Sequence, residues 1–128
     1  MEINDTLSEN VMKVLKARYL LKFEDGKQEK PDELFRRVAG AIASADEEYQ
    51  DFDKEESKEI FYKMMKSFEF LPNSPTLMNA GTGAGTLSAC FVMGLEDSME
   101  GIMETAKEAA LVQKFGGGTG FALSAPRE

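Results

Sequence analysis

The sequence predicts a chain of mixed α and β structure, in which a small helical bundle is followed by one βαβ unit. Three observations predict this fold. Apolar residues recur at helical spacing through residues 1–70, which hold 17 of the 23 acidic and 12 of the 15 basic residues. The stretch Leu71–Leu95 then contains no Asp, Glu, Lys or Arg. Beyond it, two short apolar runs flank a helical stretch and a glycine turn. We therefore predict a helical domain over residues 1–70 and an α/β domain over residues 71–128.

Start and stop signals divide the first part into three predicted helices. The first spans about Ser8–Lys22 and ends before the turn signal Glu24–Lys27. The second begins at Pro31, because proline is tolerated in a first helical turn and the acids after it suit the positive end of the helix dipole. The third follows Asp53, which has capping-box spacing to Glu56. We expect the third helix to bury Ile60, Phe61, Met64, Met65 and Phe68. Nothing in this part indicates chemistry.

The charge-free stretch is expected to be a loop. Pro72 and Pro75 argue against a continued helix, and glycines follow up to about Thr86. In an acidic protein, such a loop is either buried or offers N–H groups and hydroxyls to a ligand. Its polar side chains are turn formers or donors to phosphate, and composition leaves both interpretations open for Asn73, Ser74, Thr76 and Asn79.

The βαβ unit follows this loop. Ser88–Leu95 has the length and apolar character of a buried strand. A helix capped by Asp97 or Ser98 and ended by Gly116–Gly118 comes next, before a second strand over Thr119–Ser124. The two strands should be parallel. A parallel pair leaves both sheet edges open, so this part looks unfinished. The stripe that we expect the helix to bury is Met99, Ile102, Met103, Ala106, Ala109, Ala110 and Gln113.

Composition limits the classes of function. A net charge of −8 and a pI near 4.7 disfavour binding to nucleic acid or to an anionic membrane. The sequence has no run of about 18 apolar residues, so we expect no membrane span. The acidic start lacks the apolar core of a signal peptide, so we expect a cytoplasmic protein. With no histidine and one cysteine, we expect no internal disulfide and no metal site.

Three further features could carry chemistry, each with a structural alternative. Gly116–Gly120 matches neither the P-loop nor the dinucleotide fingerprint. It is typical of a helix end with a tight turn, or it lets a sugar or phosphate touch the backbone. Cys90 is a buried small apolar residue or, on an open sheet end, a redox-active thiol that needs a partner from elsewhere. Asp97 and Ser98 are explained as helix caps, and Asp97 also suits a ribose hydroxyl or a base N–H.

Four blocks of the sequence resemble a known family. They are PNSPTLMNAG, LSACFV, EDSMEGI and GGGTGFALS, within residues 72–124. Their order and spacing resemble the N-terminal part of class II, adenosylcobalamin-dependent ribonucleotide reductases. RYLLKFEDGK and ELFRRVAGAIASADEEY, further upstream, are similar to the opening helical segment of that family. The resemblance implies that the βαβ unit is the first part of a ten-stranded α/β barrel, which this chain leaves incomplete.

The resemblance also implies a reaction and a set of site residues. Family members reduce ribonucleotides to 2′-deoxyribonucleotides for DNA synthesis, using a thiyl radical generated with adenosylcobalamin. Two further cysteines supply electrons and close into a disulfide, and Cys90 matches one of them. Asp97 and Ser98 match the allosteric site for a deoxynucleoside triphosphate effector. The positions that match the substrate site are Ser74, Pro75, Thr76, Ala89, Cys90 and Gly118.

The expected partners are the ribonucleotide, the effector, the remainder of a reductase chain, a thiol reductant such as thioredoxin, and a second copy in a homodimer. No second or third cysteine is present, and the cobalamin-binding region is not in these residues. We therefore expect a segment that is inactive without the rest of the barrel. The alternative is a non-catalytic nucleotide-binding or protein-interaction module derived from the reductase N-terminus.

Overall fold

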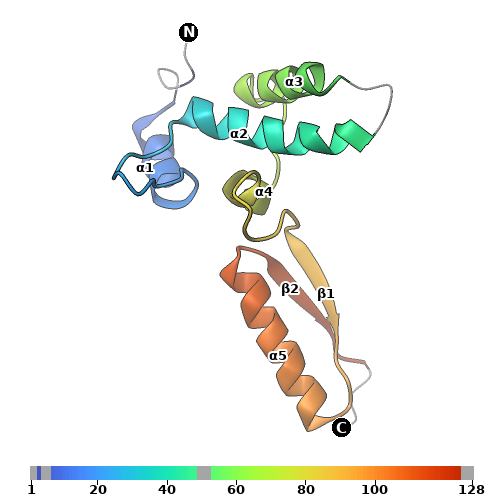
Figure 1. Ribbon diagram of the computed structural model, residues 1–128. Helices are drawn as coiled ribbons and strands as arrows, with labels where there is room; N and C mark the ends of the chain where they lie inside the picture. The colour runs from blue at the N-terminus through green and yellow to red at the C-terminus, as the bar shows by residue number, and fades with distance from the viewer. Residues whose placement is uncertain (1–2, 4–6, 49–52, 125–128) are drawn as a thin grey trace.

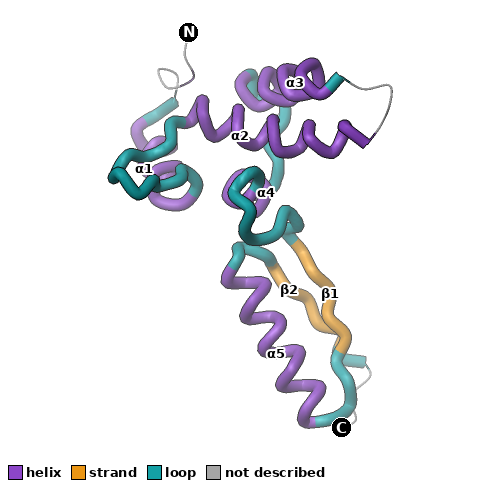
Figure 2. The backbone as a smooth tube through the Cα atoms, in the orientation of Figure 1, coloured by secondary structure: helices purple, strands orange, loops and turns teal. Residues whose placement is uncertain are grey.

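The computed structural model describes residue 3, residues 7–48 and residues 53–124. The outer ends of both predicted domains, residues 1–2, 4–6 and 125–128, lie outside the described residues. Helices occupy the first part of the chain, and a parallel strand pair with its crossover helix occupies the second (Figure 1). A short helix lies between the two parts (Figure 2).

The first helix, α1, spans Glu9–Arg18 and is capped by the Ser8 side chain, which accepts from the Val11 N–H. It ends earlier than the predicted Lys22, because the chain turns back on itself after Tyr19. Lys22 pairs with Gln28 in an antiparallel bridge, and Gly26 supplies the positive φ of +80° that this turn requires.

The core lies between α2, Pro31–Ala43, and α3, Lys54–Lys66. A short 3₁₀ helix, η2, spans Ser44–Glu48. The expected starts are confirmed: proline opens α2, and the Asp53 side chain caps α3 by accepting from two backbone N–H groups. The fully covered side chains of this core come from α2, since both Leu34 and Val38 are buried.

The predicted inner face of α3 is only partly right. Met65 is buried, whereas Ile60 is 48% exposed. Phe68 lies beyond the helix end at a φ of +60° and is 51% exposed. The side chain that α3 turns into the core instead is Tyr62, whose hydroxyl donates to Asp32 Oδ1 at 2.5 Å. Tyr62 therefore joins α3 to α2 through a polar contact as well as through packing.

The expectation of a continuous loop from Leu71 is wrong. Within this stretch, six residues form α4, Ser74–Asn79. The Asn73 side chain caps this helix by accepting from the Thr76 N–H at 2.9 Å. Pro75 stands in the first turn, where its missing N–H costs nothing. Asn followed closely by Pro is a helix start signal, so the proline that argued against a helix instead opens one.

Strand β1, Cys90–Gly94, pairs in parallel with β2, Gly118–Ala122, and α5, Met99–Lys114, crosses between them. The predicted order of strand, helix, glycine turn and strand is confirmed. The expectation that the first strand is buried is wrong, since Cys90 is exposed and Val92 is 87% exposed. The sheet has two strands in the described residues, and it is not closed. Figure 1 shows α5 running alongside both strands.

The predicted inner stripe of α5 is wrong except for Ala109. The helix buries Thr105 and Ala109, and the Thr105 hydroxyl donates to the Gly94 carbonyl at 3.2 Å. Met99 and Met103 are 71% and 62% exposed. Small residues face the sheet because they let helix and strands approach closely, while the large apolar side chains face away.

Replacing Tyr62 with phenylalanine is expected to destabilise the chain at neutral pH by about 1 kcal/mol. The hydrogen bond from Tyr62, and secondly that from Arg36, hold the pKa of Asp32 below its ordinary 3.8. A lowered pKa stabilises the folded state above the unfolded value, and this stability is lost as pH falls through the folded value. The difference in unfolding free energy between the native protein and Tyr62→Phe should therefore be largest well above pH 3.8 and decrease in stronger acid. Thermal unfolding of both proteins across this range checks it, and a difference independent of pH would contradict it.

Candidate functional site

Two residues that the sequence places 28 positions apart meet in the sheet. Cys90 is the register partner of Gly118, and the Gly118 N–H donates to the Ala89 carbonyl at 2.6 Å. The thiol of Cys90 is free and exposed. Ala89, Cys90 and Gly118, all predicted substrate-site positions, are therefore neighbours at the start of the strand pair.

The thiol lies on the face of the sheet that α5 leaves uncovered. Side chains alternate between faces along a strand. Thr119 faces α5, because its hydroxyl is 2.9 Å from Gln113 Nε2. Cys90 and its partner Gly118 are therefore on the opposite face, together with Val92, which is 87% exposed. No part of the chain that the structure describes covers this face.

The glycine turn divides into positions that the fold requires and positions that it does not. Gly116 has a φ of +87°, and a Cβ on Gly117 would lie 2.6 Å from Val112 Cγ1. Both are needed for the helix end and the tight turn. A Cβ on Gly118 would lie 3.5 Å from its nearest atom, the Ala89 carbonyl oxygen, which is an ordinary contact distance. A Cβ on Gly120 would lie 4.0 Å from the Phe91 carbonyl oxygen. Packing within the described chain therefore does not explain Gly118.

Of the three predicted substrate residues on α4, Ser74 is the exposed one. Its Oγ is 2.9 Å from the Tyr19 hydroxyl. Pro75 and Thr76 are buried. The Thr76 hydroxyl is within hydrogen-bond distance of the Leu87 carbonyl, at 2.9 Å, and of Asn73 Oδ1, at 2.8 Å. Thr76 thus links α4 to the segment that leads into β1.

Asn79 has a structural role that the sequence left open. Its Nδ2 donates to the Thr86 carbonyl at 2.7 Å and to the Phe115 carbonyl at 3.3 Å. Gly85 has a φ of +78°, and a Cβ there would lie 2.5 Å from Asn79 Cγ. Asn79 therefore joins α4, the glycine loop and the end of α5. Polar residues in a glycine-rich loop signal such crosslinks, but the sequence does not say which backbone groups they reach.

The predicted effector residues lie apart from the substrate positions. Asp97 and Ser98 follow the far end of β1, next to the start of α5 (Figure 1). The Ser98 hydroxyl accepts from the Gly101 N–H at 3.0 Å and caps the helix. The structure therefore separates the predicted residues into two groups, at opposite ends of one strand.

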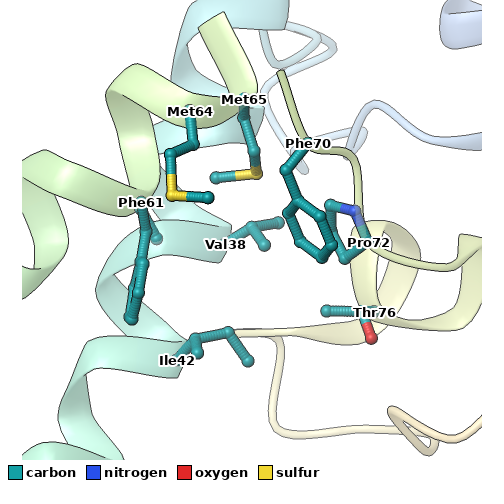
Figure 3. Close-up of a pocket in the computed structure, with 9 residues that line it drawn as sticks. Val38, Ile42, Phe61, Met64, Met65, Phe70, Pro72 and Thr76 are labelled. Atoms are coloured by element: carbon teal, nitrogen blue, oxygen red, sulfur yellow. The ribbon is translucent and has the colours of Figure 1, made fainter. Parts of the chain in front are cut away.

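A cavity of about 430 Å³ lies elsewhere, between α2, α3 and the segment that enters α4. Figure 3 shows its lining of aliphatic, aromatic and methionine side chains, with Thr76 at one edge. The hydroxyl of Thr76 is used within the chain. Such a lining does not suit a phosphate, whose oxygens need donors.

Neither a cluster suited to a metal ion nor a membrane-spanning helix is found in the described ranges. In residues 3, 7–48 and 53–124, no group of three or more His, Cys, Asp or Glu side chains is placed to hold a metal ion. None of the helices in the same ranges has the length and apolar character needed to cross a membrane.

Comparison with known proteins identifies the family. Residues 5–85 match the ribonucleotide reductase all-alpha domain, and residues 88–128 match the ribonucleotide reductase barrel domain. The chain belongs to the ribonucleotide reductase family. The predicted fold class is thereby confirmed: a helical N-terminal part is followed by the start of the barrel domain. The division after residue 70 stays a prediction, since α4 is bonded to both parts.

The individual relatives are reductases of two descriptions. A vitamin B12-dependent ribonucleoside-diphosphate reductase of Mycobacterium tuberculosis is 44% identical over 119 residues, which are 92% of this chain and 17% of that protein. One of Thermoplasma acidophilum is 38% identical, covering 92% of this chain and 23% of that protein. The ribonucleoside-diphosphate reductase subunit alpha of Helicobacter pylori is 36% identical, covering 91% and 14%. The chain thus spans about a fifth of these proteins.

Gly117→Ala is expected to destabilise the chain by about 1–3 kcal/mol, because the added methyl overlaps Val112 and Phe91. Gly120→Ala, three residues further along in β2, is the matched control, and we expect its stability within about 0.5 kcal/mol of the native value. Urea unfolding of the three proteins measures both effects. Equal destabilisation by the two substitutions would contradict the packing assigned to Gly117.

Proposed function

We propose that this chain forms part of an oxidoreductase that converts ribonucleotides to 2′-deoxyribonucleotides, and that it supplies one redox cysteine. The observation that supports this role is the position of Cys90, exposed on the uncovered sheet face opposite Gly118. Family membership and the reductase names of the relatives support the reaction class. The chain spans a small share of those relatives, so activity is proposed for the complete reductase.

The redox step uses the Cys90 thiol and a second thiol from outside this chain. Each thiol gives up one proton and one electron, and an S–S bond forms between them. The carbon–oxygen bond at the 2′ position of the ribose breaks, and its oxygen leaves as water with one of the two protons. The second proton and the two electrons form the new carbon–hydrogen bond at the 2′ position. A dithiol reductant of the thioredoxin type then reduces the disulfide and restores Cys90.

The substrate cradle combines the start of α4 with the start of the strand pair. Ser74 offers a hydroxyl to the ribonucleotide, while Pro75 and Thr76 shape the helix that carries it. Ala89 and Gly118 present backbone beside the thiol, and the missing side chain of Gly118 leaves room for the ligand. The stretch around them carries no charge, so phosphate oxygens meet no carboxylate there.

The effector proposal concerns the other end of β1. Asp97 and Ser98 would take a deoxynucleoside triphosphate, with Asp97 accepting from a ribose hydroxyl or a base N–H. Their separation from Cys90 by the length of β1 suits a regulatory ligand that does not touch the substrate. We further propose that the complete reductase forms a homodimer and is located in the cytoplasm.

The cofactor proposed for the complete reductase is adenosylcobalamin. It rests on the relatives: identity is 44% and 38% to two proteins named vitamin B12-dependent, and 36% to one without that description. The described residues contain no side-chain cluster suited to a metal ion. They do not form a cobalt site, and no step proposed here depends on one.

Cys90→Ser is expected to lower the rate of multiple turnover with a thiol reductant by at least about 10³-fold, because serine cannot form the disulfide. Nucleotide binding should remain within about threefold, since the two side chains differ by one atom. Both are measured on the complete reductase that carries this segment. Unchanged turnover would remove Cys90 from the mechanism.

Gly118→Ala tests the substrate cradle separately. We expect an unchanged fold, because the added methyl has an ordinary contact distance, and a KM for the ribonucleotide raised about tenfold by the lost space. Gly120→Ala, two residues further along the same face, should change KM less. A KM equal to that of the native enzyme in Gly118→Ala would contradict a ligand at this position.

A further inference from the structure

Arg37 makes an ion pair that is almost fully enclosed in the helical part. Its Nε is 2.7 Å from Glu29 Oε1, and its Nη2 is 3.0 Å from Glu29 Oε2. The two side chains are 13% and 4% exposed. Glu29 also accepts from the Leu21 N–H at 3.2 Å, which fixes the carboxylate against the turn after α1. The pair is a two-bond fork with a defined orientation.

The same guanidinium also binds the end of α4. Nη1 donates to the Ala80 carbonyl, and Nη2 donates to the Leu77 carbonyl at 3.3 Å. These carbonyls belong to the last turn and the cap of α4, where a cation is favourable. A helix of 6 residues is not stable by itself, so its position depends on such contacts. The chain leaves α4 directly over Arg37, since a Cβ on Gly81 would lie 2.9 Å from Arg37 Cγ.

The opposite end of α4 is held by the same part of the molecule. The Tyr19 hydroxyl, at the end of α1, is 2.9 Å from Ser74 Oγ. From α4, Thr76 and Asn79 reach the segments beside Cys90 and the glycine turn. Hydrogen bonds on both sides of α4 therefore connect the ion pair in the helical part to Leu87, in the segment that leads into the strand with the thiol.

We propose that Arg37, oriented by Glu29, and Tyr19 are positioning residues that set the place of Ser74 relative to Cys90 and Gly118. This inference rests on the proposed substrate role of Ser74. Lysine cannot take over this positioning role of Arg37, because one ammonium group cannot bind the carboxylate and the two carbonyls at once as a planar guanidinium does. The helical part thereby determines how well the ribonucleotide is held, although it does not touch it.

The test compares Arg37→Lys with Arg36→Lys in the complete reductase that carries this segment. Arg36 is the matched control: it is also on α2 and pairs with a carboxylate, Asp32, but it lies over the Tyr62 ring of α3 instead of α4. Arg37→Lys should raise KM for the ribonucleotide about tenfold and change kcat by less than about threefold. Arg36→Lys should leave KM within about twofold. Equal effects of the two substitutions would overturn the inference.

Combining each substitution with Ser74→Ala separates positioning from general stability. If Arg37 acts through Ser74, Arg37→Lys should change KM by less than about twofold in the Ser74→Ala background. Additive effects would overturn the inference. Tyr19→Phe removes one exposed hydroxyl, and its effect on KM should likewise be smaller in the Ser74→Ala background. This second variant tests the positioning role if Arg37→Lys does not fold. A Ser74→Ala enzyme with native KM would remove the proposed substrate role itself, and native KM in Arg37→Lys and Tyr19→Phe alone would remove only the positioning role.

Discussion

The parallel pairing of β1 with β2 is the constraint on which the site depends. Parallel strands cannot be joined by a tight turn, so the chain must cross back through α5 before it can pair. The glycine turn at the end of α5 then sets the register, and the register puts Cys90 beside Gly118. One face of the pair is covered by α5, so the thiol is left on the other face. Every proposed role of the strands follows from this register.

The helical part and the strand pair are joined through backbone carbonyls. Arg37 donates a side-chain hydrogen bond to the Leu77 carbonyl in the last turn of α4. Thr76 and Asn79 each donate one to a carbonyl in the loop before β1. Buried carbonyls need donors, so these side chains satisfy the loop and fix it at the same time. A charge-free, glycine-rich segment can therefore have a defined position, which a substrate site requires.

Local signals in the sequence predicted where elements start and stop, and packing between elements accounts for the rest. Caps at Ser8, Asp53 and Ser98 depend on neighbouring residues, so the helix starts followed from the chain itself. The face of α5 did not, because helical periodicity marks its large apolar residues while the sheet accepts its small ones, Thr105 and Ala109. The short helix α4 was missed although Asn73 and Pro75 form a local start signal, because Pro72 before it and the glycines after it are typical of a loop. Contacts from other parts of the chain stabilise so short a helix.

The sequence predicted the candidate site in part, as it did the fold. Resemblance placed Cys90, Gly118 and Ser74 in one site, and the structure brings the first two together. No pattern in the sequence shows that Arg37 reaches a carbonyl 43 residues away, because that contact exists only in three dimensions. The redox role of Cys90 is tested most directly by alkylating its thiol in the complete reductase, before and after one turnover without external reductant. We expect a reactive thiol before turnover, a protected disulfide after it, and a reactive thiol again on reduction. Product formed while Cys90 stays fully reactive would contradict this role.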